Sequence, residues 1–187
     1  MTSSAFQSRL RPMLTWSAAP QFITHQIGWW ACVLLMGWLG PLVMLAFLAL
    51  HFYMTRTVWR GEMMIAFVAV IVGICVDNFL HSMGAVEYVG RLRIGSAPLW
   101  LVGIWAGFGV TLRHHQSLFV RKWPNALLVG SLGGPLAYLG GVKLARFTVP
   151  ESTGWVSVSL AWTIAMGVLF LTVRYANQSS SQSKSWS

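Results

Sequence analysis

Six long apolar runs, separated by short polar stretches, dominate the pattern of hydrophobic and polar positions along the chain. A helix needs about 20 mostly apolar residues to cross a bilayer, and each run comes close to that length. Glycine, proline and basic residues mark the ends of the runs. We therefore expect an all-α integral membrane protein, a bundle of six transmembrane helices over Phe22–Leu39, Leu42–Trp59, Gly61–Gly84, Pro98–Ser117, Trp123–Val142 and Gly154–Arg174.

The division between the first two runs depends on the pair Gly40-Pro41. Proline lacks the amide hydrogen that continues a helix, so this pair predicts a turn. A single long kinked helix over both runs is the alternative. Residues 1–20 are expected to form a cytoplasmic segment without the features of a cleavable signal, residues 21–175 the six-helix domain, and residues 176–187 a disordered Ser/Gln-rich tail.

Small residues crowd the fifth run, which contains Gly130, Gly133, Gly134, Pro135, Gly140 and Gly141. Glycine costs about 1 kcal/mol inside a helix, so its repetition needs a physical reason. One interpretation is close packing, because small residues let membrane helices approach each other. The other is a helix broken at Pro135, with the break lining a cavity. Both interpretations stay open.

Composition excludes an ordinary water-soluble domain. Charged residues make up 9% of the chain and hydrophobic residues 56%, whereas soluble domains carry roughly 25% charged residues. The formal net charge is +9. The basic residues lie singly or in pairs between apolar runs, as in membrane loops, so we do not expect nucleic-acid binding. Cys32 and Cys75 both lie within apolar runs and predict no disulfide.

Basic residues give the expected bundle an orientation, because loops rich in Lys and Arg stay in the cytoplasm. Of the 13 Lys and Arg residues, four fall on the side opposite the termini, and the remaining nine fall on the side of the termini. The four are Arg91, Arg93, Lys143 and Arg146. With six spans, both termini are expected in the cytoplasm.

Asp77 is the only one of the four acidic residues that lies well inside an apolar run. A charge in hydrocarbon costs several kcal/mol unless it is paired or faces water, so a buried acid is a functional candidate. His81 follows four residues later, on the same helix face. As candidate catalytic residues, Asp77 and His81 would act as an acid–base pair. The alternative is a polar pair that only joins helices.

Depth along the bundle predicts which residues can share a pocket with Asp77. It lies 16 residues after Gly61, roughly 24 Å at about 1.5 Å per residue. That height falls in the outer quarter of a hydrocarbon core about 30 Å thick. Four residues of the later runs are expected near the same height in the membrane, and a fifth residue follows Asp77 directly in the sequence. The predicted ligand-binding pocket comprises Asn78, Trp105, Tyr138, Lys143 and Trp162.

A second polar cluster is expected at the cytoplasmic face, most of the membrane thickness away from Asp77. It comprises His25, Glu62, Arg113, His114 and His115. A basic interface that binds lipid headgroups is the simplest interpretation. The His spacing matches no metal-binding motif, and no P-loop, nucleophile elbow or dinucleotide fingerprint occurs. No metal is therefore expected, and no cofactor is indicated.

Three segments carry a resemblance to a known family: VGICVDNFL in the third run, APLWLVGIWAGFGVTLRHH in the fourth and GSLGGPLAYLGGVKLA in the fifth. Over about Phe22–Phe170 the chain resembles an uncharacterised bacterial inner-membrane family, domain-of-unknown-function family 2878. That family usually carries a Leu-Asn-His-Ser-like stretch after the fourth span. This chain has Leu-Arg-His-His at 112–115 instead, so the resemblance assigns no role to His114.

Genes of such proteins often accompany ones resembling cyclopropane-fatty-acid-synthase-like methyltransferases and flavin-dependent amine oxidases. The resemblance thus implies a role in lipid modification or membrane stress. A lipid-binding or accessory component of such a pathway is the first hypothesis, with membrane lipids, a lipid-modifying enzyme or a second copy of the chain as partners. The second is a membrane-embedded enzyme that acts on a lipid through Asp77 and His81. The third is a small transporter or flippase.

Overall fold

The computed structural model describes residues 23–55, 59–114, 122–150 and 152–182, which are mostly helical. Six helices follow one another along these residues, and the fifth of them is interrupted. They comprise a helix over residues 23–35, α2 (Leu39–Met54), α3 (Trp59–Ser82), α4 (Leu99–His114), an interrupted helix over Trp123–Lys143, and α8 (Ser152–Gln182). The helical fold class is therefore confirmed.

Three of the helices are long and apolar enough to cross a membrane, namely Trp59–Ser82, Trp123–Lys143 and Ser152–Gln178. α2 and α4 are apolar but have 16 residues each. At about 1.5 Å per residue this gives roughly 24 Å, less than a hydrocarbon core about 30 Å thick. Helices of membrane-spanning length are thus present, whereas the number of spans and their orientation stay predictions.

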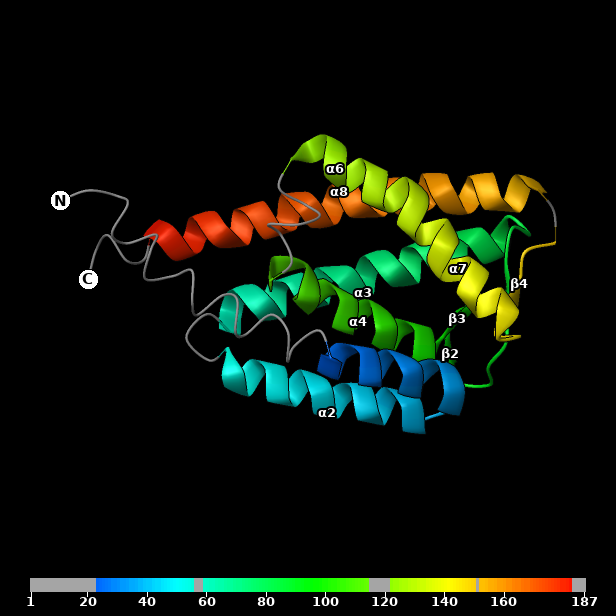
Figure 1. Cartoon of the computed structure of the whole chain (residues 1–187), viewed down its shortest axis with the longest axis horizontal. Helices are drawn as coiled ribbons and strands as arrows, with labels where there is room; N and C mark the ends of the chain where they lie inside the picture. Colours follow the sequence, from blue (N-terminus) through cyan, green and yellow to red (C-terminus); the bar gives the residue numbers. More distant parts are fainter. Residues whose placement is uncertain (1–22, 56–58, 115–121, 151, 183–187) are drawn as a thin grey trace.

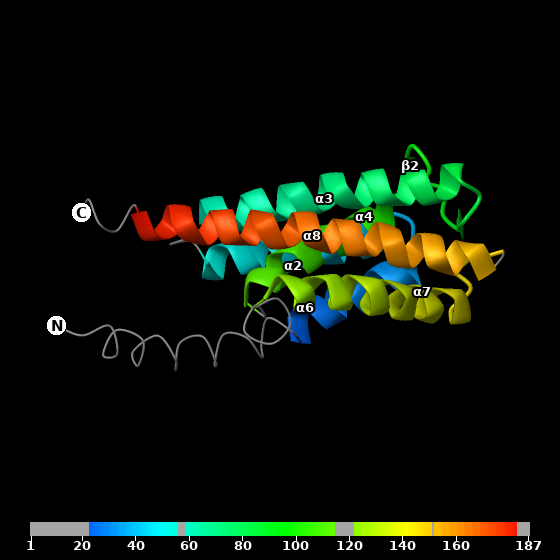
Figure 2. The same cartoon turned by 90° about the horizontal axis from the view of Figure 1, so that it is seen from above.

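α3 packs against both α4 and α8 and lies between them in the view of Figure 1, whereas Figure 2 shows it at an edge of the bundle. The buried face of α3 includes Glu62 near its start, Ala69 and Gly73 in its middle, and Asp77 near its end. Small residues along this face bring α4 close, because a Cβ on Gly109 of α4 would lie 2.6 Å from the Cβ of Ala69. α3 is therefore the element that positions both predicted polar clusters.

The first two helices are separate, and the turn between them lies at residues 36–38. Met36 and Gly37 both have positive φ angles, 45° and 48°, which reverse the chain. The predicted end of the first helix at Gly40-Pro41 is wrong. Gly40 and Pro41 are buried in the first turn of α2, where the missing amide hydrogen of proline breaks no helical bond.

The fifth apolar run forms α6 (Trp123–Leu128), a π-helical segment η1 (Val129–Gly133) and α7 (Gly134–Lys143). Pro135 is the second residue after the π-helical segment, as expected for a residue that removes a helical hydrogen bond. On the side facing α8, a Cβ on Gly130 would lie 2.6 Å from the carbonyl oxygen of Trp162. The run therefore combines a continuous helix, with a π-helical segment in its middle, and a close backbone contact to α8.

Four two-residue strands lie in the loops at the end of the bundle where α3 and α7 end (Figure 1). β1 (Glu87–Tyr88) pairs with β4 (Phe147–Thr148), so Tyr88 lies opposite Phe147. β2 (Arg93–Ile94) pairs with β3 (Ala97–Pro98). The polar stretch after α3 is thus tied to the loop after α7, and Tyr88 is carried into the interior.

α8 continues to Gln182, beyond Arg174, where the sequence predicted its end. Its buried positions face α3 and the interrupted helix, because α8 contacts α3, α6, η1 and α7. The predicted N-terminal segment, residues 1–20, lies outside the described residues.

Replacing Gly130 by Ala is expected to destabilise the bundle, because the added methyl group would meet the backbone of Trp162 and Thr163 at 2.6–2.8 Å. Overpacking of this kind costs about 1–3 kcal/mol. Gly140→Ala is the matched control on the same run, since no atom lies within 4 Å of its added Cβ. Thermal unfolding in detergent should show a lower melting temperature for Gly130→Ala alone. Equal melting temperatures would contradict the close contact.

Candidate functional site

The Asp77 carboxylate is fully buried and accepts hydrogen bonds from three side chains. The hydroxyl groups of Tyr138 and Tyr88 donate to Oδ1, at 2.7 and 3.1 Å. The indole Nε1 of Trp105 donates to Oδ2 at 3.0 Å. The donors come from α7, β1 and α4, so one carboxylate joins four segments of the chain. Hydrogen bonds to a charged acceptor are about twice as strong as neutral ones, which offsets the cost of burial.

Gly73 makes room for this arrangement one helical turn before Asp77. A Cβ at Gly73 would collide with the indole ring of Trp105. The ring therefore lies across α3 at the glycine, and its N–H reaches the carboxylate four residues later. Residues at this spacing share a helix face. The sequence of α3 therefore provides both the space for the Trp105 ring, at Gly73, and the acceptor for its N–H, at Asp77.

Tyr88 reaches Asp77 because β1 pairs with β4 and turns the phenol inward, where it is 5% exposed. Burial, and then the negative charge of Asp77, raise the pKa of the Tyr88 phenol above its ordinary value. Tyr88 therefore keeps its proton at the pH of ordinary assays. Its hydroxyl also lies 3.2 Å from that of Tyr138, so the two phenols and the carboxylate form one network.

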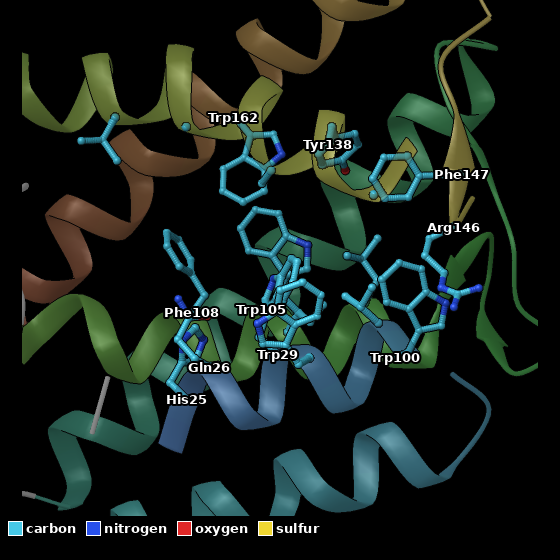
Figure 3. A pocket seen from close by; sticks show the side chains of 18 residues that line it. His25, Gln26, Trp29, Trp100, Trp105, Phe108, Tyr138, Arg146, Phe147 and Trp162 are labelled. Atoms are coloured by element: carbon cyan, nitrogen blue, oxygen red, sulfur yellow. The ribbon is translucent and has the colours of Figure 1, made fainter. Parts of the chain in front are cut away.

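A cavity of about 380 Å³ lies next to this network, between the helix over residues 23–35, α4, the interrupted helix and the loop after α7. Its wall is mostly apolar, and its aromatic members are Trp29, Trp30, Trp100, Trp105, Phe108, Tyr138, Phe147 and Trp162. Small-molecule sites commonly occupy roughly 300–1,000 Å³. Figure 3 shows an elongated arrangement, with Trp29 and Trp105 in the middle, His25 toward one end and Arg146 toward the other.

Trp105 and Tyr138 belong to both features, since their rings line the cavity while their polar atoms bond to Asp77. Trp162 stacks on Trp105, with ring centroids 4.5 Å apart. Asp77 is not among the lining residues and lies behind these rings. The carboxylate therefore holds two walls of the cavity in place without contacting its interior.

Two donors of the cavity wall have no hydrogen-bond partner within the described part of the chain. They are Nε of Arg146 and Nε1 of Trp162, both buried. Buried donors normally have partners, so each such atom indicates a ligand, a water molecule or an ion that supplies an acceptor. Neither Asp nor Glu occurs among the lining residues. The cavity thus favours an apolar molecule that carries acceptor oxygens.

The other predicted pocket residues face elsewhere. Asn78 caps the β2–β3 turn, because its Oδ1 accepts from the Ser96 amide at 2.6 Å and its Nδ2 donates to the Ile94 carbonyl oxygen. His81 Nδ1 lies 3.2 Å from the Val86 carbonyl oxygen. Lys143 is exposed in the last turn of α7. Among the described residues, Asp77 bonds to neither His81 nor Lys143, whereas Trp105, Tyr138 and Trp162 do gather beside it.

The second predicted cluster is partly assembled at the opposite end of α3. His114 Nε2 lies 3.4 Å from Glu62 Oε1. His25 is buried but packs against the Phe47 ring of α2 and lines the cavity instead. The Arg113 side chain and the whole of His115 lie outside the described residues.

Sequence reasoning missed Tyr88, His51, Arg146 and Phe147. Tyr88, Arg146 and Phe147 lie in loops, where no helical rise predicts height. His51 gave a signal, because an ionisable residue inside an apolar run is a candidate by the same rule that selected Asp77. Its Nε2 lies 3.2 Å from Glu62 Oε2.

Fold and site together define a class of protein, a helical bundle that contains helices long and apolar enough to cross a membrane and that encloses an aromatic cavity. The chain belongs to the family described as protein of unknown function (DUF2878), whose model matches residues 19–168. The resemblance noted from the sequence is thereby confirmed. Neither the curated proteins nor the solved structures gave a match.

Asp77→Asn is expected to lower the melting temperature of the purified protein in detergent. The substitution replaces one acceptor oxygen by an NH₂ group, which faces side chains that also donate. At least one donor then loses its acceptor, and a buried unsatisfied group costs about 1–3 kcal/mol. For a chain of this size that corresponds to a fall of several degrees. Cys75→Ala, at an exposed position of the same helix, should leave the melting temperature unchanged. An unshifted Asp77→Asn variant would show that the network does not stabilise the bundle.

Proposed function

We propose that this chain is a multi-pass protein of the bacterial inner membrane that binds a lipid chain or a similar amphipathic molecule in its aromatic cavity. It would act as an accessory component of membrane-lipid modification. The observation that carries the proposal is the cavity itself, an apolar aromatic space with two unpaired donors in its wall.

The outer surface of the long helices supports a membrane location. Phe67 of α3, Leu136 of α7 and Ile164 of α8 are 67%, 67% and 69% exposed. Soluble monomers rarely expose large apolar patches, whereas hydrocarbon solvates such side chains. The distribution of Lys and Arg between the loops supports both termini in the cytoplasm.

The cavity wall supports an amphipathic ligand with an oxygen-bearing end. Aromatic faces pack well against hydrocarbon. The guanidinium of Arg146 pairs with phosphate or carboxylate oxygens, and the indole N–H of Trp162 donates to any oxygen acceptor. A purely apolar ligand would leave both donors unpaired, at about 1–3 kcal/mol each.

The position of Asp77 favours binding over acid–base chemistry. Its oxygens are occupied by three donors, and two rings separate it from the cavity. A general acid or base must come within hydrogen-bond reach of the reacting atom. Asp77 is therefore better interpreted as a positioning residue for Trp105 and Tyr138. The accessory role in lipid modification rests on the family resemblance alone.

Filling the cavity is expected to remove the bound lipid. Ala137 lines the cavity, whereas its neighbour Leu136 does not, so Ala137→Trp and Leu136→Trp introduce the same side chain inside and outside. Native mass spectrometry of the protein released from mild detergent would measure the lipid-bound fraction. A steric cost of about 1–3 kcal/mol when the ligand enters the filled cavity corresponds to a fall of about 5- to 150-fold in affinity for Ala137→Trp. Leu136→Trp should match the wild type.

The lipid-binding proposal is contradicted if Ala137→Trp, eluting as the wild type does on size exclusion, keeps the wild-type lipid-bound fraction. A wild-type protein that carries no lipid after extraction with native membrane patches would also overturn it. Arg146→Ala, with Lys143→Ala at an exposed position as its control, tests separately whether Arg146 binds the oxygen-bearing end of the ligand. Selective loss of anionic lipids in Arg146→Ala is the expected result.

Reporter fusions test the proposed topology separately. Alkaline phosphatase, which is active only outside the cytoplasm, should be active when inserted near residues 89–92 and near residue 145. A fluorescent protein at the C-terminus should fold in the cytoplasm. These results follow from the excess of Lys and Arg on the side of the termini. An alkaline phosphatase that is active when fused to the C-terminus would contradict the proposed orientation or the number of six spans.

A further inference from the structure

Three helix ends meet at His51, Glu62 and His114, at the end of the bundle opposite the strands. His51 lies in the last turn of α2, Glu62 in the first turn of α3, and His114 is the last residue of α4. The side chains of His51 and Glu62 are 0% exposed and that of His114 is 16% exposed. None of the three lines the aromatic cavity, so they form an independent polar centre.

One carboxylate faces both imidazoles through different oxygens. His51 Nε2 lies 3.2 Å from Glu62 Oε2, and His114 Nε2 lies 3.4 Å from Glu62 Oε1. The two imidazole rings are 5.3 Å apart between centroids. One possible ligand atom from each residue lies within 4.8 Å of the other two. Such a convergence of two nitrogens on one carboxylate matches the spacing of ligands around a single ion.

The Nε2 atom of His114 gives a second indication of a bound ion. Its Nε2 is buried, yet it has no hydrogen-bond partner among the residues that the structure describes. If His51 alone were the imidazolium that balances Glu62, this nitrogen would stay unsatisfied, at about 1–3 kcal/mol. A cation between the three groups would instead use the lone pairs of both imidazoles and the charge of the carboxylate.

We infer that His51, Glu62 and His114 form a binding site for one divalent transition-metal ion, of the Zn²⁺ class. Zinc binds His nitrogen and Glu oxygen at about 2.0–2.2 Å in tetrahedral geometry, which places neighbouring ligand atoms about 3.3 Å apart. The two nitrogen–oxygen distances already lie near that value. Two imidazoles and one carboxylate are also a ligand set that leaves a fourth position open for water or substrate.

The position of the site gives the ion a structural consequence. α2, α3 and α4 each contribute one ligand within a turn of a helix end, so a bound ion would clamp the three ends together. The ring of Phe47 contacts both His51 and His25, with centroid distances of 6.0 and 5.8 Å. Since His25 lines the cavity, one aromatic ring separates the metal site from the lipid-binding space.

Metal analysis of the full chain in detergent tests the site directly. The protein is purified without a polyhistidine tag, stripped with a chelator and dialysed against buffered Zn²⁺. The wild type is expected to retain about one Zn²⁺ per chain. His51→Gln and His114→Gln should each weaken binding by at least about 100-fold, since even loss of an outer-shell partner costs 10–100-fold. His81→Gln is the matched control and should bind as the wild type does.

Cobalt keeps the proposal testable if a ligand variant fails to fold, as judged by size exclusion. Co²⁺ added to the stripped wild type should give the intense visible absorption of a four-coordinate nitrogen and oxygen site, and Zn²⁺ should abolish it. The inference is overturned if the folded wild type retains no Zn²⁺ and gives no such spectrum. It is equally overturned if His51→Gln and His114→Gln fold and bind Zn²⁺ as tightly as His81→Gln.

Discussion

A carboxylate inside a bundle of apolar helices must find hydrogen-bond donors, because unpaired burial costs several kcal/mol. Asp77 finds them on three other segments, at Tyr88, Trp105 and Tyr138. This requirement fixes α3, α4, α7 and the loop of β1 relative to one another at one level of the bundle. The same bonds orient the rings of Trp105 and Tyr138 toward the cavity, so the shape of an apolar space depends on a buried carboxyl group outside it.

The helices could be predicted from the sequence because their signal is local. Apolar runs of sufficient length, ended by polar or small residues, predicted every described helix to within a few residues at most ends. The exceptions are the end of α8, which lies at Gln182 and not at Arg174, and the first turn, where Gly40-Pro41 was a stronger local signal than Met36-Gly37. Proline is equally acceptable at a turn and in the first turn of a helix. In the structure Gly40 lies against the backbone of Cys32 on the preceding helix, a tertiary contact that the local sequence does not reveal.

Residues of the site could be predicted from the sequence only where they lie in helices, because the position in a helix gives the height of a residue along the bundle. A constant rise along a helix placed Trp105 and Tyr138 at the height of Asp77. The same arithmetic says nothing about Tyr88, which reaches the carboxylate because β1 pairs with β4, far away in the chain, and Tyr88 lies opposite Phe147. Asn78 was included because it adjoins Asp77 in sequence. Adjacent residues on a helix point in different directions, since 3.6 residues complete a turn, and Asn78 faces the β2–β3 turn instead.

The polar centres of the bundle differ in how completely their atoms are satisfied. The oxygens of Asp77 accept from three donors, so this centre connects segments of the chain and stabilises the fold. Arg146 Nε, Trp162 Nε1 and His114 Nε2 are buried without hydrogen-bond partners in the described part of the chain. Unsatisfied buried atoms are rare because each one opposes folding, and they persist where binding supplies the missing partner. The proposed binding sites therefore lie where these three atoms lie, two in the cavity wall and one beside His51 and Glu62, while Asp77 holds the cavity walls formed by Trp105 and Tyr138 in place.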